Sequence, residues 1–66
     1  MTRIESIIQA CDGWENRYCV VRINGSRIER LFAWSTYGQA IGHYHQHEER
    51  GATLAIVYNR EIIRSS

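Results

Sequence analysis

Three histidines lie within the five residues HYHQH at positions 43–47. On a helix, His43 and His47 share a face at the spacing by which two imidazoles can bind one transition-metal ion, whereas His45 points elsewhere. A catalytic zinc ion needs a third protein ligand, and no HExxH pattern is present because the acidic residues follow the histidines. The segment is therefore interpreted as a solvated helix face with neutral imidazoles, and no metal or cofactor is expected.

The remaining reactive side chains form no catalytic pattern. The serines lie in expected turns or near the termini without a GxSxG sequence, Asp12 is the only aspartate, and no Gly-rich phosphate loop occurs. Cys11 and Cys19 fall in segments expected to be neighbouring strands, where a disulfide is geometrically conceivable. Without a signal peptide or a membrane-length apolar run, a cytoplasmic location with free, inert thiols is expected instead. We predict that the chain is not an enzyme.

Length and composition indicate one small domain over residues 1–66. The chain has 66 residues, 44% of them hydrophobic, and no proline, which favours a folded protein with a limited core. Either a monomer or a small homo-oligomer is expected. The net charge of +1 gives little electrostatic attraction to nucleic acid or to a membrane surface.

The segment on which the fold depends is RYCVVRINGSRIERLFAW, residues 17–34, which predicts a β-hairpin around Asn24-Gly25-Ser26. A two-residue loop at Asn24-Gly25 would oppose Arg22 to Arg27, which is unfavourable. A four-residue loop over residues 24–27 is preferred, and a three-residue loop with a bulge is an alternative that sends other side chains to the core. The preferred register pairs Arg22 with Glu29, Ile23 with Ile28, Val20 with Leu31 and Cys19 with Phe32.

Residues 3–10, RIESIIQA, predict a first strand because of their isoleucines, and Asp12-Gly13 predicts the turn that leads into the hairpin. Trp14 lies beside this turn. Its ring is either folded over the end of the core or displayed to a partner as an aromatic anchor. The three strands would form an antiparallel meander.

A helix is expected after Trp34, with Thr36 as the N-cap and Gly51 as the C′ residue. Gln39 at N3 would complete a capping box with Thr36. An apolar stripe predicts the face laid on the sheet: Tyr37, Ala40, Ile41, Tyr44 and His47 or Glu48, with Gln39, His43, Gln46, Glu49 and Arg50 directed away from it. Gly38 and Gly42 weaken the helix, and close packing is a reason to tolerate them.

The C-terminal part predicts one or two further strands. Residues 52–58 are apolar on both faces, which indicates a central strand. Residues 59–66 either continue this strand or turn at Asn59-Arg60 and return as a fifth strand. The predicted fold is α+β: an antiparallel sheet, βββαβ or βββαββ, with one helix packed on one face.

Arginines and aromatic residues are the most informative surface side chains. On an open sheet they would anchor a protein interface or stack on single-stranded bases. Because the net charge is low and no RNP-type sequence occurs, protein is ranked above nucleic acid as the partner. The predicted partner-binding residues are Arg22, Arg27, Arg30, Glu29, Tyr18, Trp14 and Arg60.

In size and order of elements the chain resembles the small anti-CRISPR proteins carried by phages and mobile elements. The resemblance rests on the hairpin RYCVVRINGSRIERLFAW followed by STYGQAIGHYHQHEERGATLAIVY, and it carries no family motif and no residue roles. It implies a stoichiometric inhibitor, acting without a cofactor in the host cytoplasm, that binds a CRISPR effector complex and blocks target DNA recognition or nuclease recruitment. The alternatives are a small nucleic-acid-binding module, similar to the arm-binding domains of integrases, and a metal-binding protein at the histidine segment.

Overall fold

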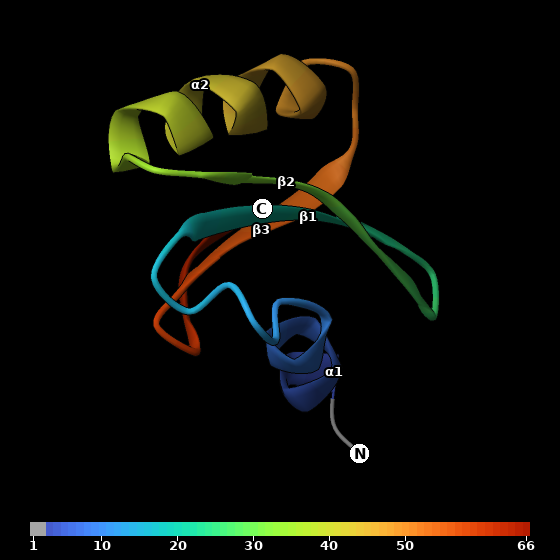
Figure 1. Cartoon of the computed structure of the whole chain (residues 1–66). Coiled ribbons are helices and arrows are strands. Elements are labelled where there is room, and N and C mark those ends of the chain that lie inside the picture. The colour runs from blue at the N-terminus through green and yellow to red at the C-terminus, as the bar shows by residue number, and fades with distance from the viewer. Residues whose placement is uncertain (1–2) are drawn as a thin grey trace.

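A computed structural model of the chain describes residues 3–66, which form an α+β fold with a four-stranded antiparallel sheet. The elements, in chain order, are α1 (Arg3–Ala10), β1 (Tyr18–Asn24), β2 (Arg27–Trp34), α2 (Tyr37–Glu48), β3 (Thr53–Tyr58) and β4 (Glu61–Ser65). The sheet order is β2-β1-β3-β4. Figure 1 shows the sheet edge-on, with α2 on one side and α1 on the other. The predicted class, α+β with an antiparallel sheet, is confirmed.

The prediction of a first strand at residues 3–10 is wrong, because this segment is the helix α1. Ile4, Ile7 and Ile8 have the i, i+3, i+4 spacing of one helix face, and this period outweighs the strand preference of isoleucine. Ile7 is buried against the sheet, whereas Ile4 remains largely exposed. The prediction of a single helix on one face is corrected accordingly, since a helix covers each face.

The hairpin register is confirmed near its turn. Arg22 is opposite Glu29, and Ile23 is opposite Ile28. The turn itself is shorter than predicted, because Asn24 pairs with Arg27 and only Gly25-Ser26 connect the strands. Gly25 has a φ of 65°, the left-handed conformation that suits glycine at the first central position of a tight hairpin turn.

A β-bulge changes the register beyond Val21. Val21 is opposite Arg30 and Val20 is opposite Phe32, so Leu31 is the extra residue on β2. The predicted pairs of Val20 with Leu31 and Cys19 with Phe32 are therefore wrong. Instead, Cys19 is opposite Ala33. The bulge allows Leu31 to pack against the core under α2.

The predicted N-cap of α2, Thr36, is confirmed, but the predicted capping box is only half formed: Gln39 Oε1 accepts from the hydroxyl groups of Ser35 and Thr36 rather than from the backbone N–H of Thr36. The Thr36 hydroxyl oxygen accepts a hydrogen bond of 3.3 Å from the backbone N–H of Gln39, and Gly51 has a φ of 87°. Close packing does not account for Gly38 and Gly42, since a Cβ atom at either position would meet no atom within 4 Å. Ala40 and Tyr44 of the predicted stripe are buried, whereas Tyr37 is 40% exposed.

The C-terminal segment turns at Asn59-Arg60 and returns as β4, so the alternative with an additional strand is confirmed. Asn59 and Arg60 have φ values of 52° and 63°, the two positive values required by a type I′ hairpin turn. β3 pairs with β1 on one side and with β4 on the other, which confirms its predicted central position.

Two cores lie on opposite faces of the sheet. The core under α1 contains Ile7, Cys11, Cys19, Val21, Ala55 and Val57. The core under α2 contains Val20, Ala40, Tyr44, Leu54 and Ile56. Because successive residues of a strand point to opposite faces, the apolar runs of β1 and β3 supply both cores. Within the described residues, neither helix is long and apolar enough to cross a membrane.

Candidate functional site

The outer edge of β2 is the first candidate surface. β2 has the sheet's first position and pairs only with β1, so its other edge carries backbone groups with no neighbouring strand among residues 3–66. Three side chains of this strand are exposed, Arg27, Arg30 and Phe32. We call these three residues the β2 edge surface. Phe32 is 50% exposed, and its ring lies 4.6 Å from the Trp34 ring, centroid to centroid.

Trp14, Arg30 and Arg60 lie on or beside the sheet face covered by α1, at the end formed by residues 11–17. The Trp14 ring packs on the core under α1, so the first of its two predicted placements is confirmed. The Arg30 guanidinium lies 3.9 Å above this ring, in a cation–π contact. Arg60 forms ion pairs with Asp12 at 2.8 Å and with Glu15 at 3.6 Å. Arg60 thus joins the β3–β4 turn to the segment before β1.

Arg22, Glu29 and Tyr18 lie on the other face. Arg22 Nη2 donates a hydrogen bond of 3.0 Å to Glu29 Oε2 across the hairpin. The Tyr18 ring stacks on the Tyr58 ring at 4.2 Å between centroids, near the opposite end of the strand. The seven predicted residues therefore do not form one surface on an open sheet face. The prediction of an open face is wrong, because α1 covers the face expected to be free.

Hydrogen bonds between ring nitrogens of Trp34, His43 and His47 link β2 to α2, and the sequence did not predict them. Trp34 Nε1 donates to His43 Nδ1 at 3.0 Å, and His43 Nε2 lies 3.1 Å from His47 Nε2. The prediction that His43 points away from the sheet is wrong, since its ring is half-buried between Trp34 and His47. Burial and the neighbouring His47 lower the pKa of His43 below its ordinary value of 6.5.

The direction of these hydrogen bonds follows from the indole, because its N–H can only donate. His43 Nδ1 must accept, so the proton of neutral His43 is on Nε2 and is donated to His47 Nε2. Neutral His47 then carries its own proton on Nδ1. In this arrangement His43 has no free lone pair on Nε2 for a metal ion. Among residues 3–66, no group of three or more His, Cys, Asp or Glu side chains is placed to hold one.

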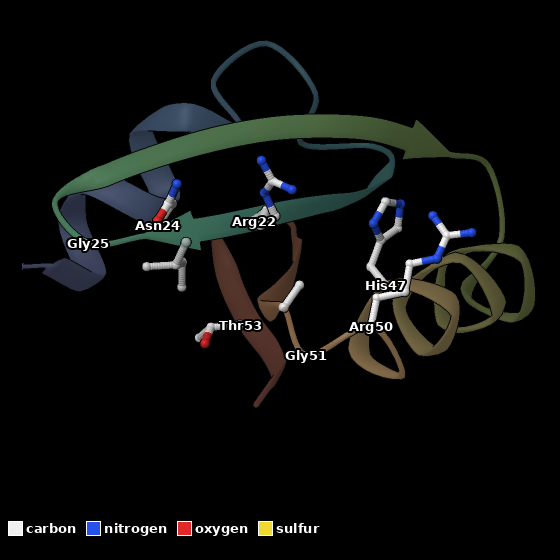
Figure 2. Close-up of a pocket in the computed structure, with 9 residues that line it drawn as sticks. Arg22, Asn24, Gly25, His47, Arg50, Gly51 and Thr53 are labelled. Atoms are coloured by element: carbon white, nitrogen blue, oxygen red, sulfur yellow. The ribbon is translucent and has the colours of Figure 1, made fainter.

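A polar groove of about 550 Å³ lies beside the C-terminal end of α2. Its polar and charged lining comes from three parts of the chain: Arg22 and Asn24 of β1, His47 and Arg50 at the end of α2, and Thr53 of β3. Figure 2 shows His47 and Arg50 projecting from the end of α2, with Arg22 projecting from β1. Sequence reasoning did not select Arg50, because only the fold brings residues 22 and 50 to one groove.

The two cysteines are free thiols and both are buried in the core under α1. Cys19 is on β1 as predicted, but Cys11 follows α1 rather than lying on a strand. A hydrogen bond from Cys11 lowers the pKa of Cys19 and raises that of Cys11, and burial opposes ionisation of both. Because both thiols are shielded from solvent, reagents reach them poorly in the folded protein.

No family model matches this chain, and no curated protein or solved structure matches it either. Its function is therefore argued from the surfaces described above.

Proposed function

We propose that the protein is a non-enzymatic binding protein that contacts a partner protein through the β2 edge surface. The observation that carries this proposal is Phe32, a large aromatic side chain that is half exposed on an edge strand. Aromatic residues and arginines are the types most enriched at the centres of protein interfaces. Two arginines lie on the same strand as Phe32: Arg30, and Arg27 nearer the turn.

The strand itself supplies a second means of binding. With eight residues, β2 is the longest of the four described strands, and its outer backbone groups can pair with an extended segment of a partner. Side chains would then add selectivity from both faces. Phe32 lies opposite Val20 and so projects on the face of α2, whereas Arg30 lies opposite Val21 on the face of α1. A partner strand at this edge would contact both.

The partner that we propose is a CRISPR effector complex. This choice is supported by the resemblance, in size and in the order hairpin, helix and strand from β1 to β3, to small anti-CRISPR proteins, and this resemblance implies stoichiometric binding. An inhibitor of this kind needs a rigid scaffold and an exposed surface but no catalytic group. The protein would occupy a surface that the effector needs for target DNA recognition or for nuclease recruitment.

The test measures target DNA binding and cleavage by a panel of purified CRISPR effector complexes, with the protein added in increasing amounts. We expect inhibition of one complex at a ratio near one to one. Phe32→Ala should weaken binding by roughly tenfold or more, because truncation of an aromatic anchor typically costs at least 1–2 kcal/mol.

The matched control is Ile63→Ala, since Ile63 is 42% exposed on the opposite edge strand, β4. Equal losses for Ile63→Ala and Phe32→Ala would exclude the β2 edge surface as the binding site. A gel-shift experiment at two salt concentrations provides the second control. Direct, salt-sensitive binding to DNA or RNA with no effect on any effector would replace the proposal with a nucleic-acid-binding function.

A further inference from the structure

We propose that the groove between β1 and the C-terminal end of α2 is a binding site for a phosphate group. This inference goes beyond the proposed binding function and does not depend on it. The groove is on the face of α2, whereas Arg27 and Arg30 of the β2 edge surface do not line it. Its positive charge and the number of hydrogen-bond donors in its lining support an oxyanion as the ligand.

The groove exists because the hairpin is longer than the helix that covers it. The 12 residues of α2 span about 18 Å, whereas the eight residues of β2 span about 26 Å. The hairpin therefore continues beyond α2, as Figure 1 shows, and this leaves part of β1 uncovered. The floor formed there by Arg22 and Asn24 meets a wall formed by the end of α2.

The groove carries positive charge without an acidic residue in its described lining. Arg22 and Arg50 both line it, together with His47. Glu29 binds Nη2 of Arg22, which holds the guanidinium in place and offsets part of its charge. The Nε–H of Arg22 is buried and has no hydrogen-bond partner among the described residues. Arg50 is exposed, and its side chain forms no ion pair or hydrogen bond with any other residue in the range 3–66.

The histidine contacts add a neutral donor at the same place. Because His47 Nε2 accepts a hydrogen bond from the Nε2–H group of His43, the N–H of His47 itself is at Nδ1. His47 is one of the residues that line the groove, and its Nδ1 side offers a hydrogen-bond donor rather than an acceptor. Trp34 determines which nitrogen of His47 carries the proton, although the two residues are not in contact through this hydrogen bond. Its indole N–H donates to Nδ1 of His43, which leaves the His43 proton on Nε2. An anion gains from a neutral donor of this kind as well as from the arginines.

Hydrogen bonds at the end of α2 reduce the opposition that a helix C-terminus presents to an anion. The C-terminal carbonyl groups of a helix carry partial negative charge, which would oppose an anion. Here two of these carbonyl groups accept hydrogen bonds from the following turn: His47 O accepts from the N–H groups of Arg50 and Ala52 at 3.1 and 3.2 Å, and Glu48 O accepts from Gly51 at 2.9 Å. Two arginines and an N–H donor from separate elements fit a tetrahedral dianion with several acceptor oxygens better than a single carboxylate.

The experiment follows backbone amide resonances of the ¹⁵N-labelled protein during titration with inorganic phosphate, at ionic strength held constant with sodium chloride. We expect saturable shifts at Arg22 and at residues 50–53. A second titration uses sodium acetate, a monoanion with two acceptor oxygens. Phosphate should bind roughly tenfold more tightly than acetate, since it forms at least one further charge-assisted hydrogen bond.

Arg50→Ala should weaken phosphate binding by roughly tenfold or more, and Arg50→Lys should restore part of it, because lysine keeps the charge but not the fork of donors. The matched control is Arg17→Ala, which removes an exposed arginine outside the groove. Both arginines are exposed, and the spectra themselves report whether each variant is folded. Equal weakening by Arg17→Ala and Arg50→Ala, equal affinity for acetate and phosphate, or shifts that do not saturate would each overturn the proposal.

Discussion

Trp34 Nε1 donates a hydrogen bond of 3.0 Å to His43 Nδ1, and this contact fixes where both neighbouring imidazoles carry their protons. It also ties the last residue of β2 to the middle of α2. Protonation of His43 would place an N–H at Nδ1 directly against the indole N–H, so the contact exists only while His43 is neutral. Protonation of His43 at mildly acidic pH would therefore break this link between β2 and α2.

The first prediction concerns pH. Burial and His47 lower the pKa of folded His43 below 6.5, so the unfolded chain takes up this proton at a higher pH than the folded protein does. The His43 contribution to the free energy of unfolding should therefore decrease as the pH falls through 6.5 and become constant below the folded pKa. Urea unfolding at several pH values between 7.5 and 5.0 measures it.

Two variants isolate this contribution. His43→Gln should show a shallower pH dependence than the wild-type protein, because it lacks the titrating group. Trp34→Phe should raise the pKa of His43, as measured from its ring proton resonances, because no donor then favours the neutral form. If the wild-type protein and His43→Gln lose stability in parallel over this range, the lowered pKa of His43 has no part in it.

The second prediction concerns the thiols of Cys11 and Cys19, whose residues are only 4% and 0% exposed. A thiol must ionise and be reached by the reagent before it reacts. We expect no appreciable reaction of the folded protein with Ellman's reagent at pH 7.5, followed by reaction of both cysteines in 6 M guanidinium chloride. Rapid modification of either thiol without denaturant would show that the core under α1 opens readily.

The third prediction concerns the pair formed by Arg22 and Glu29, whose side chains are 39% and 33% exposed. A double-mutant cycle with Arg22→Ala and Glu29→Ala should give a coupling of roughly 0.2–1 kcal/mol in the free energy of unfolding, the range typical of partly exposed pairs. Added salt at 1 M should reduce this coupling by screening. A coupling that is zero at low salt would mean that apolar matching alone sets the hairpin register.

The hairpin shows what local sequence chemistry can predict. The opposite charges of Arg22 and Glu29 predict the register near the turn, although the turn is shorter than predicted. Thr36 predicts the start of α2, whereas its last residue, Glu48, lies three positions before Gly51. These signals act between near neighbours in the chain. The β-bulge at Leu31 was not predictable, because it depends on how β2 packs under a helix that comes later in the sequence.

The first helix and the candidate surfaces were not predicted from the sequence, because they depend on contacts between distant parts of the chain. Isoleucine favours strands, so the composition of residues 3–10 predicts a strand although the spacing of their isoleucines is helical. The histidine spacing was visible, but the donor that orders the two rings is Trp34, on a different element. The groove joins Arg22 to Arg50 across 28 positions of sequence, and no local pattern connects them.

The last prediction compares the effects on stability of replacing two glycines, Gly42 and Gly51, by alanine. Gly42 lies inside α2, where a Cβ atom would meet no atom within 4 Å, whereas Gly51 has a φ of 87°. Gly42→Ala should stabilise the protein by roughly 0.5–1 kcal/mol, because alanine loses less backbone entropy on entering a helix. Gly51→Ala should destabilise it by about 1–2 kcal/mol, because a Cβ atom is unfavourable in the left-handed region. Thermal or urea unfolding of both variants measures the two effects, and a stabilising Gly51→Ala would show that the end of α2 adopts another conformation in solution.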